Sequence, residues 1–255
     1  MSAETATAKT EGQTLLEAMH APADALRDDL MSGITNGIVN HPRSLQQRIG
    51  PSELGTPCEH CLAAKLAGWT EQRDAAWLPT VGTAVHAWLA DEFMGTPRWL
   101  TETKVEVGDL NGVPITGSAD LFDLASGTVI DWKIVGVGTL RTVRASGPSD
   151  QYRAQAHLYG RGFARAGHRV ERVAIAYLFR NAFPTAQMHL WTEDYDESVA
   201  VAVLDRATTM LRRLDAMYAV GADVDAYVSS LPRADGCYSC PRYPDALPEM
   251  LEARR

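Results

Sequence analysis

The sequence reads Gly-Ser-Ala-Asp at residues 117–120 and Val-Ile-Asp-Trp-Lys at residues 129–133, with a Ser-Gly pair between them. Each stretch is a short apolar run that ends in charge: Asp120 closes the first, and Asp131 and Lys133 close the second. Two such runs joined by a short turn predict neighbouring strands, which would bring the two aspartates together. Hydrolysis of a phosphodiester needs a divalent cation, which carboxylates bind, and a group that orients or deprotonates the attacking water. The pattern therefore predicts a metal-dependent phosphodiesterase site.

Strand geometry adds to this prediction. Side chains two apart on a strand share a face, so Asp131 and Lys133 are expected to face one cleft, while Trp132 points to the other side. An Asp-x-Lys triplet alone is weak evidence, because charges two apart more often form a solvated strand face. The flanking sequence therefore has to decide the matter.

Two helical patterns flank the strands. Gly82 and His86 begin an amphipathic helix, and Gln155 and Tyr159 lie four apart on one face of a later helix. A histidine on an apolar helix face is more often a core residue than a ligand, and Tyr159 read alone is a plain core aromatic. Gln151 is a rival to Gln155, but the spacing to the tyrosine selects Gln155.

In this order, the four motifs resemble the RecB-like branch of the PD-(D/E)xK nuclease superfamily, from about residue 82 to residue 159. Within that branch, the chain is most similar to small single-domain exonucleases related to the CRISPR adaptation nuclease and to the nuclease domains of bacterial helicase-nucleases. The resemblance implies an α/β fold with a restriction-endonuclease-like core, in which a mixed central β-sheet is flanked by helices. It also implies a divalent-metal-dependent deoxyribonuclease, specifically an exonuclease.

The resemblance also implies roles for single residues. Mg²⁺ or Mn²⁺ would be bound by carboxylates and a backbone carbonyl, and a histidine ligand would favour Mn²⁺. Lys133 would position or activate the attacking water, while the glutamine and the tyrosine would orient Lys133 or the DNA backbone. The expected metal ligands are His86, Asp120, Asp131 and the carbonyl of Trp132, and the expected catalytic set is Asp120, Asp131, Lys133, Gln155 and Tyr159. Asp123, three residues after Asp120, would point to the opposite strand face, and His157, Glu102 and Glu106 are interpreted as ordinary surface positions.

All four cysteines of the chain fall in two Cys-x-x-Cys pairs, Cys58 with Cys61 and Cys237 with Cys240. Two such pairs can close one tetrahedral thiolate site for zinc or for an iron-sulfur cluster, and disulfides or buried free thiols are the alternative. The resemblance implies a [4Fe-4S] cluster, although related nucleases usually place one cysteine before the core and three after it. The two-and-two arrangement here is the ordinary spacing of structural zinc sites. We expect the cluster, with zinc as the alternative, and His60 as a bystander.

The charge of the chain is unevenly spread. Its formal net charge is −8, which argues against a protein that coats nucleic acid in general. Between residues 141 and 180, however, eight arginines stand against Asp150 and Glu171, which gives 8 − 2 = +6. We expect a basic stripe beside the acidic site, as DNA binding requires, with about half of these arginines only solubilising a helix. The eight are Arg141, Arg144, Arg153, Arg161, Arg165, Arg169, Arg172 and Arg180.

Hydrophobic periodicity and turn residues give the expected organisation. Residues 1–50 form a helical arm and linker, and residues 51–255 form the nuclease domain closed by the four-cysteine site. Residues 136–149 are interpreted as a mobile DNA-contacting loop, with an ordinary connector as the alternative. Expected helices are 14–31 in two pieces that break at Pro22, then 61–69, 81–93, 149–166 and 197–218. Expected strands are 103–107, 113–115, 119–124, 128–135, 172–179 and 186–191.

These features predict an exonuclease that acts on DNA in replication, recombination or repair, in the cytoplasm of a bacterium or a phage-infected host. The alternatives are a non-catalytic DNA-binding adaptor that keeps the fold and an endonuclease of the same superfamily. No apolar run approaches the roughly 18 residues that span a bilayer, so no membrane partner is expected. A homo-oligomer, or a recombination or replication partner protein, is compatible with this function.

Overall fold

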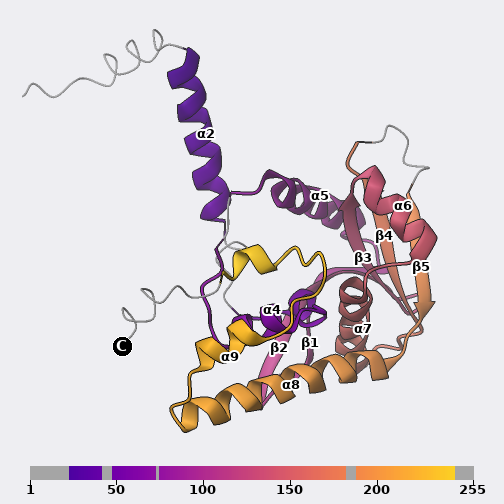
Figure 1. Ribbon diagram of the computed structural model, residues 1–255. Coiled ribbons are helices and arrows are strands. Elements are labelled where there is room, and N and C mark those ends of the chain that lie inside the picture. Colours follow the sequence, from indigo (N-terminus) through magenta and orange to yellow (C-terminus); the bar gives the residue numbers. More distant parts are fainter. Residues whose placement is uncertain (1–22, 42–47, 73–74, 182–187, 245–255) are drawn as a thin grey trace, which may run out of the picture. The chain divides into compact units, whose positions relative to one another are not determined.

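The computed structural model describes residues 23–41, 48–72, 75–181 and 188–244 (Figure 1). The chain divides into two compact units. The smaller comprises residues 1–46 and 73–77, and the larger comprises residues 47–72 and 78–255. The described part of the smaller unit is mainly helix α2 (Ala23–Val39). All of the strands and the predicted site residues belong to the larger unit.

The larger unit is built on a five-stranded sheet whose spatial order follows the sequence order. Only the β3–β4 pair is parallel, and the other three pairs are antiparallel, so the sheet is mixed. A parallel pair needs a crossover connection, and the segment between β3 and β4 supplies two helices for it. The strands are β1 (Trp99–Leu110), β2 (Val113–Asp123), β3 (Thr128–Val135), β4 (Arg172–Phe179) and β5 (His189–Asp194).

Helices cover the sheet on both sides (Figure 1). Leu89 of α5 packs with Trp132 and Ala176 on one face, while Leu158 and Phe163 of α7 pack on the other. Alternation along β3 places Trp132 on the α5 side and Val129 and Val135 on the α7 side. The helices of this unit are α3 (Pro51–Leu54), α4 (Glu59–Leu66), α5 (Trp77–Phe93), α6 (Val137–Ser146), α7 (Asp150–Arg165), α8 (Glu197–Ala219) and α9 (Val224–Ser230), followed by the 3-10 turn η2 (Cys240–Arg242).

A separate apolar cluster surrounds the cysteines. Cys58 and Cys61 are buried there together with Leu214 of α8, Val228 of α9 and Tyr243. The residues of this cluster come from three distant parts of the sequence. The large core under α7 contains no cysteine among its described residues. The larger unit therefore has a sheet core and a second core around the cysteine pairs.

The expected fold class is confirmed, because the structure is α/β with a mixed central sheet flanked by helices. The strands expected at 128–135 and 172–179 are found at those residues. The two runs expected at 113–115 and 119–124 form one strand, β2, and β1 is longer than the run expected at 103–107. Strand β5 begins after the expected start at residue 186, and the expected helical piece that starts at residue 14 lies outside the described residues.

The loop expected at residues 136–149 is wrong. Residues 137–146 form helix α6, which begins after Gly136 and ends before Gly147. Leu140 and Val143 are buried on one helical face, and this short apolar stripe stabilises the helix. The glycines at positions 136, 138 and 147 dominate the sequence pattern, but two of them stand at the helix ends, where glycine is common. Helices α3 and α9 were also not predicted.

Candidate functional site

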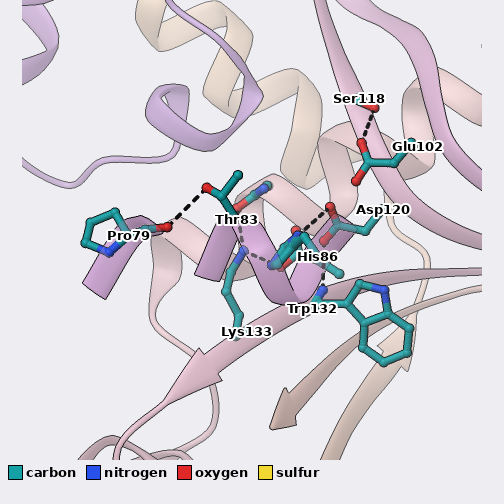
Figure 2. A network of polar contacts seen from close by, with 10 residues as sticks. Pro79, Thr83, His86, Glu102, Ser118, Asp120, Trp132 and Lys133 are labelled. Atoms are coloured by element: carbon teal, nitrogen blue, oxygen red, sulfur yellow. Dashed lines mark hydrogen bonds and ion pairs between the residues drawn. The ribbon is translucent and has the colours of Figure 1, made fainter. Parts of the chain in front are cut away.

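The site lies where strands β2 and β3 separate. Their ladder starts at the turn and ends at the pair Leu121 and Ile130, one residue before Asp120 and Asp131. Beyond that pair, the Asp120 side chain takes the place of the ladder, because its Oδ2 accepts a hydrogen bond of 2.8 Å from the backbone N–H of Trp132 (Figure 2). The two predicted aspartates therefore stand at the point where β2 and β3 part, just past the end of their ladder. We call this point the fork.

Asp131 is the most buried charge of the site. Its side chain is ion-paired with Lys133 Nζ, and its Oδ1 is buried without a hydrogen-bond donor among the described residues. The pKa of Asp131 is raised to about 6. Burial is the main cause and the charge of Asp120 adds to it, while the charge of Lys133 acts in the opposite direction. Burial lowers the pKa of Lys133, but Asp131 and Asp120 outweigh it and raise that pKa above its ordinary value. An unsatisfied buried carboxylate oxygen is the kind of atom that a cation would satisfy.

Lys133 is held by two residues of α7. Its Nζ donates to Gln155 Oε1 at 3.2 Å and lies 4.6 Å from the ring centroid of Tyr152, a residue that the sequence did not single out. The rival Gln151 instead donates to the backbone carbonyl of Ser52 at 2.6 Å. The structure therefore brings Gln155, and not Gln151, to the lysine.

Tyr159 of α7 is buried in the sheet core. A Cβ atom added at Gly117 would lie 3.1 Å from the Tyr159 ring and 2.8 Å from Pro51 of α3. Gly117 is therefore required for close packing, and Tyr159 forms part of the surface against which it packs. The predicted tyrosine thus packs beside the motif glycine, which lies three residues before Asp120 on β2.

His86 reaches the fork from α5. Its Nδ1 lies 3.2 Å from Asp120 Oδ1, so both oxygens of that carboxylate are engaged (Figure 2). Burial raises the pKa of Asp120, but the hydrogen bond and charge of His86 and the charge of Lys133 lower it to a value below the ordinary one. One turn earlier on α5, a Cβ atom at Gly82 would meet no described atom within 4 Å. The helix face beside His86 is therefore open at Gly82.

Glu102 is a member of the site that sequence reasoning missed, since it was interpreted as an ordinary surface position. Ligand atoms of His86, Glu102 and Asp120 all lie within 4.8 Å of one another. Glu102 stands opposite Asp120 on β1, between the pairs Thr101–Leu121 and Thr103–Ala119, and accepts a 2.6 Å hydrogen bond from Ser118 Oγ (Figure 2). Counting back from the turn of the β1–β2 hairpin would have placed Thr103 opposite Asp120, because the register shifts between Glu106 and Gly108.

Trp132 separates the site from the core beneath α5. Its ring is stacked on Phe93, with centroids 5.7 Å apart, so the side chain points away from Asp131 and Lys133. The parallel ladder pairs Trp132 with Ala176 of β4. The expected alternation along β3 is therefore present, and the metal-binding role of the Trp132 carbonyl stays a prediction.

Asp123 has a structural role in the β2–β3 turn. Its carboxylate accepts two hydrogen bonds from Arg98, at 2.8 and 2.6 Å, and one each from Ala125 N and Ser126 Oγ. These hydrogen bonds lower the pKa of Asp123 well below its usual range, and the bond from Arg98 has the largest effect. The rival carboxylate is thus fully occupied in holding the turn.

The surface position expected for His157 is wrong. The residue is fully buried on α7, its Nε2 lies 2.5 Å from Glu193 Oε1, and its Nδ1 accepts from the backbone N–H of Asp196. Because Nδ1 is an acceptor, the Nε2 nitrogen carries the proton that is donated to Glu193. His157 therefore ties α7 to β5 and to the start of α8. The expectation for Glu106 is confirmed, since it is exposed and paired with Arg165.

The basic stripe is largely neutralised in the structure. Five of its arginines form ion pairs with acidic residues, most of which lie outside the stretch from 141 to 180. The five pairs are Arg153–Glu193, Arg161–Glu197, Arg165–Glu106, Arg169–Glu171 and Arg172–Asp194. The other three arginines of the stripe are Arg180 and, on α6, Arg141 and Arg144.

The four cysteines form a second candidate site. The Sγ atom of Cys58 lies 3.5 Å from that of Cys240, and the Sγ atom of Cys61 lies 3.7 Å from Cys237 and 3.6 Å from Cys240. All four sulfur atoms lie within 4.8 Å of one another, close enough to bind a metal ion. Burial and the neighbouring sulfurs raise the pKa of Cys61, and they raise that of Cys240 to about 11. Four cysteines this close together could ionise together only with a cation to offset the repulsion between their charges.

His60, the residue directly before Cys61, supports this group. Arg233 lies 3.2 Å from His60 Nε2, and because arginine can only donate, Nε2 must be the acceptor. The proton of the neutral ring therefore sits on Nδ1, which lies 3.9 Å from Cys61 Sγ. His60 donates toward the sulfur and is not available as a ligand through either nitrogen, in agreement with its predicted role as a bystander.

Comparisons with known proteins give only distant likenesses. No family model matches the chain, and no curated protein matches it either. Among solved structures, the chain is similar to the alkaline exonuclease LHK-Exo from Laribacter hongkongensis, with a TM-score of 0.46 and 12% identity over 75% of this chain and 100% of that one. It is also similar to a phage-related exonuclease from Haemophilus somnus 129PT (TM-score 0.45, 10% identity, 65% and 92% coverage) and to the protein SSO0001 (0.45, 16%, 72% and 86%). At these TM-scores, the case for a function rests on the geometry of this chain.

No helix among the described residues is long and apolar enough to cross a membrane.

Proposed function

We propose that this protein is a divalent-metal-dependent deoxyribonuclease of the PD-(D/E)xK type, with an exonuclease activity. One observation carries the proposal: Asp131 is fully buried, is ion-paired with Lys133 and has an oxygen without a donor, at a fork that also holds Asp120. Burying an ion pair costs free energy, and replacing it by apolar residues is often neutral or stabilising. A carboxylate kept there with an unsatisfied oxygen is therefore better explained by chemistry than by stability.

The residues at the fork fit a hard divalent cation. The group of His86, Glu102 and Asp120 offers one nitrogen and two carboxylates within 4.8 Å, and Asp131 offers its unsatisfied Oδ1. Oxygen donors suit Mg²⁺ and Mn²⁺, and the imidazole favours Mn²⁺. When bound, such an ion would polarise the phosphate and lower the pKa of a water molecule. We propose His86, Asp120, Asp131 and the carbonyl of Trp132 as its ligands, with Glu102 added to this set.

Lys133 supplies the remaining charge. With a raised pKa it stays protonated, so it donates hydrogen bonds and can stabilise negative charge that develops on the scissile phosphate. Gln155 accepts one of its protons, and the ring of Tyr152 limits its position on a second side. These contacts from α7 hold Nζ near Asp131 without neutralising it. Tyr159, packed against Gly117, acts in this proposal through the packing of α7.

The finer parts of the proposal rest on the sequence motifs. Gln155, Tyr159 and the cysteine pairs are features of the exonuclease branch, which favours cleavage from DNA ends. An exonuclease of this kind would act in replication, recombination or repair, in the cytoplasm of a bacterium or of a phage-infected cell, as a homo-oligomer or with a partner protein. The domain that carries this activity would comprise residues 51–255.

The test is the degradation of end-labelled linear DNA in Mn²⁺, in Mg²⁺ and in chelator, with wild-type protein and with Lys133→Ala. We expect trimming from the ends that requires a divalent cation and that the variant loses, while covalently closed circular DNA stays intact. Cutting of the circle would identify an endonuclease instead. A folded protein that binds DNA but cuts neither substrate with either ion would overturn the proposal in favour of an adaptor.

A matched control separates chemistry from folding. Asp131→Asn and Asp123→Asn each remove the charge of a buried aspartate, but Asp131 lies at the fork, whereas Asp123 lies at the β2–β3 turn. We expect Asp131→Asn to abolish cutting. Asp123→Asn should keep it at temperatures where the protein is folded, because Asp123 binds only Arg98 and the turn.

A further inference from the structure

The four sulfur atoms are spaced as the ligands of a single ion. A tetrahedral zinc ion with Zn–S bonds of about 2.3 Å requires its ligands to lie about 3.8 Å apart, because the edge of a tetrahedron is about 1.6 times its arm. The separations in this chain are 3.5, 3.6 and 3.7 Å. The agreement extends to both pairs, since each of these contacts joins a cysteine of the first pair to one of the second.

A [4Fe-4S] cluster does not fit the same sulfur atoms. Its four thiolates bind the outer corners of a cube of iron and sulfide, so they must lie much farther apart than the ligands of one ion. The sulfurs of this chain are in van der Waals contact, which leaves no volume for a cube between them. Accommodating the cluster would require the segment with Cys58 and Cys61 to move away from the segment with Cys237 and Cys240.

Contacts outside the sulfur atoms oppose that movement. The N–H of His60 donates to the carbonyl of Pro232 at 3.3 Å, directly between the two segments. Farther out, Gln72 N donates to the carbonyl of Arg242 at 2.8 Å, and the Arg242 guanidinium donates to Glu71 Oε1 at 3.0 Å. These bonds bracket the sulfur group on two sides, so the spacing is set by the protein framework as well as by the thiols.

The sulfur atoms of the first cysteine pair have hydrogen-bond donors close to them. Backbone N–H groups of Cys61 and Ala234 donate to the Cys58 sulfur. Cys58 is also the N-cap residue of α4, where the helix end favours a thiolate. With the His60 donor aimed at Cys61, each cysteine of the first pair has a protein donor suited to a metal-bound sulfur.

We infer that Cys58, Cys61, Cys237 and Cys240 bind one tetrahedral zinc ion, and that this chain does not carry the iron-sulfur cluster that its sequence resemblance implies. The zinc ion is structural, because four thiolates close its coordination shell and leave no position for water or substrate. This inference concerns the four-cysteine site and not the fork, so it is independent of the proposed nuclease activity.

The test is elemental analysis of the full-length protein, isolated without oxygen from cells supplied with both iron and zinc. We expect one zinc ion per chain, no acid-labile sulfide and no visible absorption. Isolation under these conditions matters because air destroys clusters and lets zinc replace them. Four irons and four sulfides per chain would overturn the inference, and so would a folded protein without any bound metal.

A second measurement does not depend on growth conditions. Metal-free protein, offered Zn²⁺ in competition with ferric iron, a thiol reductant and sulfide under anaerobic conditions, should take up zinc alone. Titration of the loaded protein with a mercurial reagent should then release one zinc ion for four thiols, detected with a coloured chelator. Formation of a brown cluster in the competition would overturn the inference. Cys240→Ser should lose the tight site while Ser239→Ala keeps it, and Lys133→Ala should keep one zinc ion even if it has no nuclease activity.

Discussion

Glu102 faces Asp120 because a bulge shifts the register of the β1–β2 hairpin. Near the turn the ladder pairs Gly108 with Ile115, but beyond the irregularity it pairs Glu106 with Thr116. Without that shift, Asp120 would stand opposite Thr103, and no glutamate would reach the fork. Glu102 also has a φ of 43°, a left-handed conformation that is uncommon for a residue with a side chain. Together with the register, this conformation supports a role for Glu102 at the site.

The first prediction compares Glu102→Gln with Glu106→Gln, two exposed glutamates of the same strand. Glu102→Gln removes a carboxylate from the group near His86 and should raise the Mn²⁺ concentration for half-maximal nuclease activity by about 10-fold or more, a size found even for outer partners of metal ligands. Glu106→Gln should leave this concentration unchanged, since Glu106 binds Arg165. Equal Mn²⁺ requirements in the two variants would remove Glu102 from the site.

The second prediction concerns Asp131 and pH. Its pKa is about 6 in the folded chain against an ordinary 3.8, so the folded chain binds more protons than the unfolded chain between these values. The contribution of this carboxyl to the free energy of unfolding is therefore fully present below about pH 4 and is lost as the pH rises through about 6. A divalent ion binds the ionised form, so Mn²⁺ should raise Tm strongly above about pH 7 and little at about pH 5.

This pH dependence is measured by thermal unfolding in Mn²⁺ and in chelator across that range. Asp131→Asn should show a much smaller Mn²⁺ effect at every pH, while Asp123→Asn should keep the wild-type dependence from a lower starting Tm. A Mn²⁺ effect of equal size at both ends of the range in the wild type would show that Asp131 does not bind the ion.

Among the elements, α6 changes the interpretation of the segment after β3. A helix holds its side chains in fixed directions, so Arg141 and Arg144 are presented from an ordered element that follows β3 directly. They lie three apart and therefore on neighbouring positions of one helix surface. Because α6 follows β3 directly and both arginines are exposed on it, α6 is the element from which we expect contact with the DNA backbone.

The third prediction is that changing both Arg141 and Arg144 to alanine weakens DNA binding and flattens its salt dependence. Each phosphate contact contributes a slope of about −0.9 in log K against log salt, so the slope should become shallower by about 2. The double change of Arg169 and Arg172, which are paired with Glu171 and Asp194, is the matched control and should leave the slope unchanged. Equal slopes in both double variants would show that α6 does not bind DNA.

At the same scale, the sequence predicts elements well where one periodicity dominates. Strand β4 carries a continuous apolar run, and strand β3 carries apolar residues on both sides of Asp131 and Lys133. Helix α7 begins after Ser149, whose hydroxyl accepts a hydrogen bond from Tyr152 N. Helix α6 was missed because glycines outnumber its two buried apolar residues. Glu102 was missed for a different reason, since no local pattern announces the bulge that sets its register. Likewise, the pairing of the basic stripe depends on acids from β1, β5 and α8.

At the scale of the whole larger unit, two cores are joined by long-range closure. The cysteine pairs connect residues 58–61 with residues 237–240, so the centre ties the segment before the sheet to the segment after α9. Around it, Leu214, Val224 and Val228 form the second core, and Trp69 donates to Asp225 at 2.7 Å. The sheet core and the fork lie outside this cluster. Loss of the metal should therefore affect the two cores to different degrees.

The fourth prediction tests this by replacing Cys237 and Cys240 together with serine. Metal binding to a structural site is coupled to folding, so its loss should cost about 3 kcal/mol or more and lower the first unfolding transition by roughly 10 °C for a chain of this size. Limited trypsin digestion should then cut faster after Arg233 and Arg242 than in the wild type, because loss of the metal frees the segment that carries them. Because the sheet core contains no cysteine, sheet content by circular dichroism should remain, and Mn²⁺ should still raise the second transition. Ser239→Ala, within the same pair, should behave as wild type. If the sheet core and the second core of the double variant unfold in one transition, the two cores form one cooperative unit. The cysteine centre would then support the fork directly.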